Sequence, residues 1–301
     1  MSNYSIKDLE HLTGVKAHTI RIWEQRYKII TPKRSETNIR YYNDDDLKLM
    51  LNVSLLNNNG FKISKIAKLT EAEIHEEVLK VVDVNDNYFD QISALTMAML
   101  EFNESHFEKI IASNILKRGF EESMIHIIMP FMHRVGVLWL TGSVSPAQEH
   151  FISHLIRQKI IVAIDAQVVD PDPQKSEFML FLPDGELHEI SLLFAAYMIR
   201  ARGFKVIYLG QSLPMVELKQ VYDSKKADFL LTVSTSIAQI GDMQKYIDDL
   251  GDTFPESKIL LTGRQIVGND YKMKDNMEVL PSLQYFRELL ESISEVGVTV
   301  R

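Results

Sequence analysis

The chain has 301 residues and a net charge of −8, with 46% hydrophobic residues, 13 glycines, 9 prolines and no cysteine. This length predicts about two domains, and the hydrophobic content indicates a folded chain rather than a disordered one. The lack of cysteine excludes disulfides, thiolate zinc sites and cysteine nucleophiles, so any metal must be held by histidine, carboxylate or a cofactor. The sequence contains no long apolar run and no secretory leader, and we therefore expect a cytoplasmic protein that does not bind membranes.

The charge is divided unevenly along the chain. Residues 1–70 carry 12 Lys and Arg against 7 Asp and Glu, a net charge of +5, which leaves −13 for the remainder. A small basic segment joined to a larger acidic one is typical of a polyanion-binding head on a sensing or catalytic body. The first segment is therefore the candidate nucleic-acid interface.

This segment begins with two short amphipathic stretches, YSIKDLEHLTGVKAHTIRIWEQRY. Ser5 is a suitable N-cap for a first helix that Gly14 ends, and a second helix with Ile20 and Trp23 on its apolar face follows. Two short helices about a glycine turn predict a helix-turn-helix.

The polar face of the second helix and the segment after it are expected to contact DNA. The run KIITPKRSETNIRYY contains two β-prone stretches separated by polar turn residues, which predicts a hairpin wing. The alternative interpretation is a helical core stripe beside a solvated basic loop. The candidate DNA-binding residues are His18, Thr19, Arg21 and Arg26 on the helix and Lys33, Arg34, Arg40, Tyr41 and Tyr42 in the wing.

The stretches TIRIWEQRY, Pro32 and RSETNIRYYNDDDL resemble the DNA-binding domain of the MerR family, over about residues 4 to 72. The resemblance implies a dimer that reads double-stranded, pseudo-palindromic operator DNA, with Arg21, Arg40 and Tyr42 at DNA-contacting positions. Asn38 stands where the family usually has glycine in the wing turn, and because Asn tolerates a left-handed conformation the turn should be kept. We assign residues 1–72 to this winged helix-turn-helix domain.

Residues 73–169 are expected to form a helical bundle, not one long dimerising helix, because VNDNY at 84–88 interrupts any heptad pattern after a helical stretch at 71–83. Apolar residues at three-to-four spacing predict further helices. The segment VDPDPQKS at 169–176 indicates a linker, since its prolines forbid a helix. The predicted helices lie at about 88–101, 104–118, 121–140 and 146–168.

Residues 176–301 are expected to form a doubly wound parallel sheet of the Rossmann-like type, because short apolar strands alternate with helices. In such sheets ligands bind outside the carboxyl ends of the strands, where His188, Ser234 and Gly263 all fall. The chain is thus predicted to be multidomain, α+β and α/β. The expected strands are 177–183, 205–210, 227–234, 258–263 and a weaker 277–280, and the expected helices are about 189–202, 214–226, 237–250 and 283–294.

The stretch PDGELHEISLL places His188 in the loop after the first strand, where by itself it would be read as a solvated residue more readily than as a metal ligand. Three short motifs together are similar to the cobalamin-binding fold, whose signature is D-x-H-x-x-G, then S-x-L, then G-G. Departures from that signature are Glu for Asp, Ser for Gly, Ser for Leu, and Arg264 in place of the last Gly. The matching positions are Glu186, His188 and Ser191, then Ser234 and Ser236, then Gly263.

The resemblance implies a role for each of these residues. His188 would replace the cofactor's own base beneath cobalt, and Glu186 would orient the imidazole, as expected for a metal-bound histidine. The small residues at the other positions would leave room for the displaced nucleotide tail.

A second motif, WLTGSVSPAQEH, separates Trp139 from Glu149-His150 by nine residues. Taken alone it fits a core Trp with a surface Glu-His pair. It is also similar to a motif of the CarH/LitR-type regulators, which combine a MerR head, a helical bundle and a cobalamin fold in this order. The resemblance implies that Trp139, Glu149 and His150 shield the adenosyl group of adenosylcobalamin, whose cobalt–carbon bond light breaks. Leu140 stands where photoreceptor members have a histidine.

We therefore predict a non-enzymatic, homo-oligomeric transcriptional regulator that binds operator DNA and senses a corrinoid, with adenosylcobalamin as the expected ligand. Light response and repression are further properties of the regulators it resembles. One alternative is a regulator whose cobalamin fold has lost the cofactor and serves as an interaction surface. Another is a corrinoid-dependent methyltransferase subunit, which would share the bundle and the sheet but has no need of a MerR head.

Overall fold

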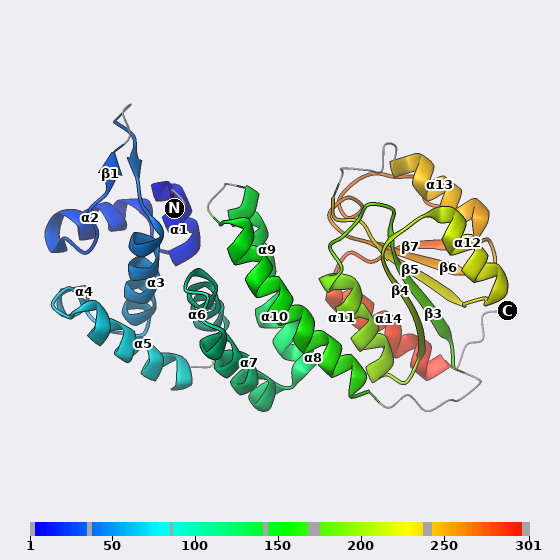
Figure 1. Cartoon of the computed structure of the whole chain (residues 1–301), viewed down its shortest axis with the longest axis horizontal. Coiled ribbons are helices and arrows are strands. Elements are labelled where there is room, and N and C mark those ends of the chain that lie inside the picture. The colour runs from blue at the N-terminus through cyan, green and yellow to red at the C-terminus, as the bar shows by residue number, and fades with distance from the viewer. Residues whose placement is uncertain are drawn as a thin grey trace. The chain divides into compact units, whose positions relative to one another are not determined.

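The computed structural model describes residues 4–34, 38–84, 87–140, 144–167, 175–236 and 243–296. They form two compact units, Met1–Leu155 and Ile156–Arg301 (Figure 1). Among these described residues, no helix has the length and apolar character needed to cross a membrane.

The first unit begins with a winged helix-turn-helix, as predicted. Ser5 caps the first helix in a capping box with Asp8, and Gly14 ends it at φ 71°. The wing strands are antiparallel, and Asn38 between them has φ 64°, which confirms the expected left-handed turn. The elements are α1 (Ile6–Thr13), α2 (Ala17–Tyr27), β1 (Lys33–Arg34), β2 (Arg40–Tyr41), α3 (Asp44–Asn58), α4 (Ile63–Ile66) and α5 (Glu71–Val84).

Glu10 holds the turn between α1 and α2. Its carboxylate pairs with the Lys16 ammonium at 3.0 Å and accepts the Ala17 N–H at 3.1 Å. The side chain of the N-cap residue, Lys16, makes no hydrogen bond to the start of α2. Glu10, which lies in α1, therefore caps α2 instead. The hydrogen bond from Lys16 and then that from Ala17 lower the pKa of Glu10.

Helices α6 to α10 form the predicted bundle stretches, with one difference. The single helix expected at 121–140 is divided by a π-helical turn at Met124–Ile128. Pro130 follows two residues later and has no N–H to donate to the carbonyl four residues before it, so a wider turn accommodates it. The elements are α6 (Tyr88–Leu100), α7 (Glu104–Arg118), α8 (Phe120–Ser123), η1 (Met124–Ile128), α9 (Met129–Leu140) and α10 (Pro146–Asp165).

Within the first unit, the start of α6 packs against the helix-turn-helix. A Cβ built on Gly14 would lie 3.3 Å from the Phe89 ring, so the ring rests on the turn between α1 and α2. The Asn59 amide, at the end of α3, donates to the buried Asp90 carboxylate at 3.0 Å. On the bundle side, the Arg134 guanidinium lies 5.3 Å from the centre of the Phe89 ring. The bundle and the DNA-binding region are therefore joined by side-chain packing as well as by the chain.

The second unit is a parallel sheet of five strands in the order β4-β3-β5-β6-β7, which confirms the doubly wound prediction and its weak fifth strand. Helices α12 and α13 cover one face, and α11 and α14 cover the other (Figure 1). The elements are β3 (Glu177–Pro183), α11 (Ile190–Ala201), β4 (Lys205–Leu213), α12 (Met215–Ser224), β5 (Phe229–Val233), α13 (Met243–Thr253), β6 (Lys258–Thr262), β7 (Met277–Val279) and α14 (Leu283–Val296).

Strand β3, which lies inside the sheet between β4 and β5, is buried on both faces. Met179 and Phe181 belong to a core cluster with Tyr222 of α12 and Leu250 of α13. Because side chains alternate along a strand, Phe178 and its alternate neighbours face the other helical layer, and Phe178 is fully buried as well. The end of β3 is therefore a rigid support for the loop that follows it.

Some predictions fall outside the described residues. They include most of the linker at 169–176, the first part of the helix expected at 237–250, and the tip of the wing at 35–37.

Gly14→Ala is expected to destabilise the first unit more than Gly60→Ala. Both glycines have positive φ, +71° and +89°, where an L side chain costs roughly 1–2 kcal/mol. Only at Gly14 would the new methyl group also meet another side chain, Phe89, whereas Gly60 has nothing within 4 Å. Thermal unfolding followed by far-UV circular dichroism measures both losses. Equal losses would mean that the contact between Phe89 and Gly14 does not hold the bundle against the turn.

Candidate functional site

The loop after β3 turns a carboxylate back towards the carboxyl edge of the sheet. In the sequence PDGE, the Glu186 N–H donates to the Pro183 carbonyl at 2.9 Å, and Gly185 between them has φ 77°. Glycine adopts this left-handed conformation without a Cβ clash, so the chain reverses within four residues. As a result Glu186, a charged residue in a loop, is only 2% exposed.

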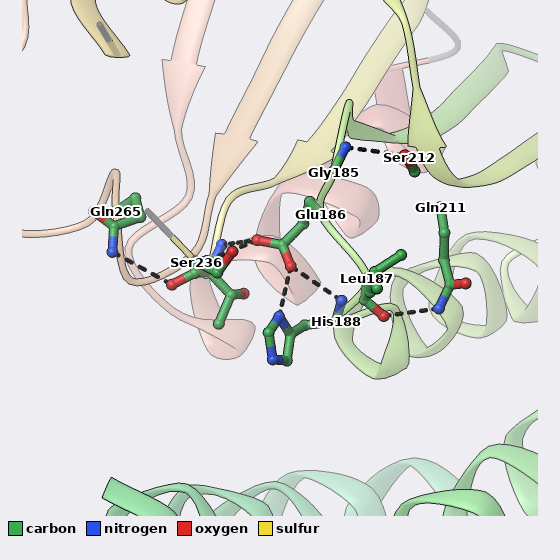
Figure 2. Close-up of polar contacts among 9 residues, drawn as sticks. Gly185, Glu186, Leu187, His188, Gln211, Ser212, Ser236 and Gln265 are labelled. Atoms are coloured by element: carbon green, nitrogen blue, oxygen red, sulfur yellow. Dashed lines mark hydrogen bonds and ion pairs between the residues drawn. The ribbon is translucent and has the colours of Figure 1, made fainter. Parts of the chain in front are cut away.

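The Glu186 carboxylate accepts four hydrogen bonds (Figure 2). One oxygen, Oε2, accepts the backbone N–H groups of Thr235 at 2.8 Å and Ser236 at 2.7 Å. The other, Oε1, accepts the backbone N–H of His188 at 3.0 Å and its ring Nδ1 at 2.6 Å. The carboxylate thus ties the loop after β3 to the loop after β5. These two strands are neighbours at the point where the strand order reverses, which is where open α/β sheets bind ligands.

The same carboxylate fixes the state of the His188 ring. An ionised carboxylate only accepts hydrogen bonds, so Nδ1 must carry the proton and the lone pair lies on Nε2. The side chain is 64% exposed, although its partner is buried. Burial alone would raise the pKa of Glu186, but the hydrogen bonds from the His188 ring and from three backbone N–H groups lower it to about 2. The arrangement is that of an imidazole oriented by a charged partner.

Gly263, at the end of β6, is required by the packing of two backbones. Its φ is +106°, and a Cβ there would overlap the backbone of Ser234. The two loops are joined by hydrogen bonds from the Ser234 N–H to the Thr262 carbonyl and from the Gln265 N–H to the Ser234 carbonyl. Within the described ranges, the Ser234 hydroxyl is a buried polar atom without a hydrogen-bond partner. The packing of the two backbones therefore explains why position 263 is glycine without reference to a ligand. The Ser234 hydroxyl, in contrast, can bond a ligand.

The other expected ligand-tail positions lie near this edge with different exposure. Ser191 is half-buried in the first turn of α11, and Ser236 is half-buried in the loop after β5. Arg264 is exposed. In the parts of the chain that the structure describes, no group of three or more histidine or acidic side chains is arranged to hold a metal ion.

The residues of the second motif lie in the first unit. Trp139, near the end of α9, is 54% exposed, which is unusual for so large an apolar side chain. In the first turn of α10, the Glu149 carboxylate and His150 Nδ1 are 2.7 Å apart. Among the described residues, no hydrogen bond or ring contact joins Trp139 to this pair. Trp139 therefore does not occupy a core position, which is the position that the motif taken alone would suggest.

Most candidate DNA-binding side chains are accessible. On α2, Thr19 is half-buried, and in the wing the Arg34 guanidinium donates to the Asn38 side chain at 2.6 Å. Arg40 and Tyr41 are half-buried. The exposed candidates are His18, Arg21, Arg26, Lys33 and Arg34.

Tyr42 is placed differently from the expectation. Its side chain is fully buried, its backbone forms a bridge with Tyr4, and its hydroxyl donates to the Glu24 carboxylate at 2.5 Å. Burial and the Glu24 carboxylate raise the pKa of Tyr42. Tyr42 therefore joins the wing to α2, and its side chain does not have the surface position that a basic, aromatic wing suggests.

Sequence reasoning also missed accessible residues. Gln25 is exposed and lies four residues after Arg21 and seven after His18, so the three share one face of α2. Helical spacing alone could have identified it. Glu189, the first residue of the helix expected at 189–202, was not among the candidate site residues, yet it is only 7% exposed, pairs with Arg157 at 2.5 Å and accepts the Tyr208 hydroxyl at 3.2 Å. These partners come from distant segments and leave no local signal.

The Glu186 network predicts a loss of stability in acid. Because the pKa of Glu186 is lowered from its ordinary value of 4.5 to about 2, its stabilisation is complete above about pH 4.5 and is lost as the pH falls towards about 2. Glu186→Gln should be less stable than the native protein at neutral pH, and this gap should narrow in acid. Urea unfolding at a series of pH values measures it, with the exposed Glu217→Gln as control. Parallel curves for the native protein and Glu186→Gln would contradict the assignment.

Two family models match the chain. One, described as MerR HTH family regulatory protein, matches residues 4–73, and the other, described as B12 binding domain, matches residues 91–163. The HTH-type transcriptional repressor CarH of Myxococcus xanthus is 28% identical over 248 residues, 78% of this chain and 81% of that protein. The repressor CarA of the same organism is 25% identical over 216 residues, 71% and 70% of the two chains.

Among solved structures, the monomethylamine corrinoid protein of Methanosarcina barkeri aligns with a TM-score of 0.47 and 13% identity, covering 74% of this chain and all of that one. The first family match covers α1 to the start of α5, and the second covers most of the bundle. The chain is a homologue of the CarH and CarA repressors, a MerR-type transcription regulator that carries a B12 binding domain.

Proposed function

We propose that this regulator binds operator DNA through its winged helix-turn-helix and senses a cobalamin, whose cobalt His188 would ligate through a ring nitrogen. The proposal rests on the Glu186 carboxylate, which is buried and accepts four hydrogen bonds. One of these comes from Nδ1 of the exposed His188 imidazole. Carboxylates that bond the second nitrogen of a metal-bound histidine raise its basicity and fix its orientation.

The residues present fit such a cofactor. The Nδ1–H donated to Glu186 leaves the basic nitrogen, Nε2, as the one that can ligate a metal. The buried hydroxyl of Ser234 can bond a polar group of a ligand tail, which would satisfy an atom that is otherwise costly to bury. When bound, a cobalamin would supply a cobalt ion that the Nε2 of His188 could ligate. A surface kept only for protein partners would not need this buried charge.

We favour a regulator over a methyltransferase subunit because the chain carries a winged helix-turn-helix. The exposed side chains of His18, Arg21 and Gln25 share one face of α2, and the first 70 residues carry a net charge of +5. Such a face on a helix-turn-helix suits the major groove, and the basic wing suits the phosphates beside it. A ligand changes operator binding only by preferring one state of the protein over another, and we propose that this state is set by homo-oligomerisation.

Arg21→Ala is expected to weaken specific operator binding by about 1–3 kcal/mol if the guanidinium reads a base. If it contacts a phosphate instead, affinity should fall evenly across sequences and the salt dependence should flatten. Gel-shift titrations at two salt concentrations distinguish these results. Lys219→Ala, which removes an exposed, ion-paired charge on α12, is the control. An unchanged Kd for Arg21→Ala on all DNA would rule out the proposed face.

We further propose that the ligand is adenosylcobalamin. Trp139 offers an exposed aromatic face, and the Glu149–His150 pair offers donors and acceptors, which together suit a nucleoside. Leu140, which follows Trp139, has no side-chain nitrogen that could ligate a metal. We therefore propose that the regulator responds to occupancy by the cofactor, and illumination of the bound complex tests whether it also responds to light.

If this assignment is right, the native protein binds adenosylcobalamin more tightly than methylcobalamin, and Trp139→Ala removes the preference. Stacking of a base on an aromatic side chain is worth about 1–3 kcal/mol, so the affinity for adenosylcobalamin should fall by roughly 5- to 150-fold. Calorimetric titration with both cofactors gives the ratio. The matched control is Leu116→Ala, which trims an 89% exposed apolar side chain of the same unit. Equal affinities in the native protein would refute the choice of ligand.

A further inference from the structure

Strand β4 departs from regular pairing with β3 at two points. Leu180 pairs with Tyr208, but Phe181 pairs with Gly210 and Pro183 pairs with Leu213, so β4 contains an extra residue in each interval. Irregularities of this kind re-aim the side chains of a strand, and they are common beside functional sites.

The second irregularity includes a strained residue. Ser212 has φ 48°, a left-handed conformation that a non-glycine residue adopts only at a cost. Gly210, two residues earlier, has φ 80°, where glycine is without strain. The left-handed backbone of Ser212 must therefore be held by contacts with its surroundings.

Those surroundings are the loop that carries His188. The Ser212 N–H donates to the Glu186 carbonyl at 3.1 Å. The Ser212 hydroxyl accepts the Gly185 N–H at 2.9 Å and donates to the Asp184 carboxylate at 3.1 Å. The Gln211 amide donates to the Leu187 carbonyl at 2.7 Å (Figure 2). Every residue from 184 to 187 is thus bonded to the irregular end of β4.

This second set of contacts complements the Glu186 network. The Glu186 carboxylate fixes the ring of His188 and ties the loop to β5, whereas β4 fixes the loop backbone from the opposite neighbouring strand. Leu187 is 62% exposed, so side-chain packing does not hold that part of the loop. A ligand to a metal must be held to within about half an ångström of its productive position.

We propose that Ser212 and Gln211 are positioning residues for His188, which act by fixing the backbone of residues 185–187 so that the imidazole is presented for coordination. The inference rests on the proposed function, because it assigns these residues a purpose only if His188 ligates cobalt. It adds β4 to the site, although neither residue belongs to the motifs that identified it.

Three variants separate the effects. Ser212→Ala removes the hydroxyl and keeps the strained backbone, whereas Ser212→Gly removes the hydroxyl and relieves the strain. Gln211→Ala removes only the bond to Leu187. The control is Ser224→Ala, which removes an exposed hydroxyl that bonds a carbonyl of its own helix, α12.

Two measurements are made on each full-length variant. Hydrogen–deuterium exchange of the peptide covering residues 184–188, in protein without cofactor, reports how firmly the loop backbone is held. Titration with adenosylcobalamin, followed by the absorbance of the base-off, His-on form, reports coordination. For each hydrogen bond lost we expect roughly two- to tenfold weaker formation of the His-on form. Exchange of the loop peptide should be faster. Ser212→Gly should weaken formation of the His-on form as much as Ser212→Ala does. It should unfold at a higher temperature than Ser212→Ala, because glycine relieves the backbone strain.

The outcomes are distinguishable. A native His-on spectrum that all three variants keep at native affinity, with native exchange, overturns the role of Ser212 and Gln211 and leaves the proposed function standing. Equal losses in the Ser224→Ala control would also overturn it, since the effect would then not belong to the loop. A native protein that gives no His-on spectrum overturns the proposed function and, with it, the purpose given to β4.

Discussion

The site depends on one buried charge. A carboxylate removed from water is costly unless every lone pair finds a donor, and Glu186 meets that requirement with donors from two loops. Each bond has a separate consequence. Those from Thr235 and Ser236 close the edge of the sheet between β3 and β5, and the one from the His188 ring sets its tautomer. Since the ring itself is exposed, the buried charge controls the chemistry of a surface group.

The fold supplies what this network requires. The buried interior strand β3 gives the loop a rigid base, and the reversal of strand order beside it places the loop after β5 within reach. Gly185 permits the turn that brings the carboxylate inward, and Gly263 permits two backbones to meet at Ser234. In the first unit, packing of Phe89 on Gly14 joins the bundle to the turn of the helix-turn-helix.

Sequence patterns predicted the elements well because periodicity is local. Helical spacing located the bundle stretches, and apolar runs located all five strands. The π-helical turn before Pro130 was missed because a proline alone does not fix how a helix adapts. The Glu186–His188 pair was found through its motif, but the burial of Tyr42, the backbone contact that requires Gly263, and the hold of Ser212 on the loop arise from tertiary packing. No spacing in the sequence encodes which neighbour a side chain meets.

The central claim is that the imidazole oriented by Glu186 ligates cobalt. The most direct test is the visible absorbance spectrum of adenosylcobalamin mixed with native protein and with His188→Ala. The account predicts a base-off, His-on spectrum for the native protein that the variant does not give, while circular dichroism shows an unchanged fold, because an exposed loop residue adds little to the core. Identical spectra for the two proteins would contradict it.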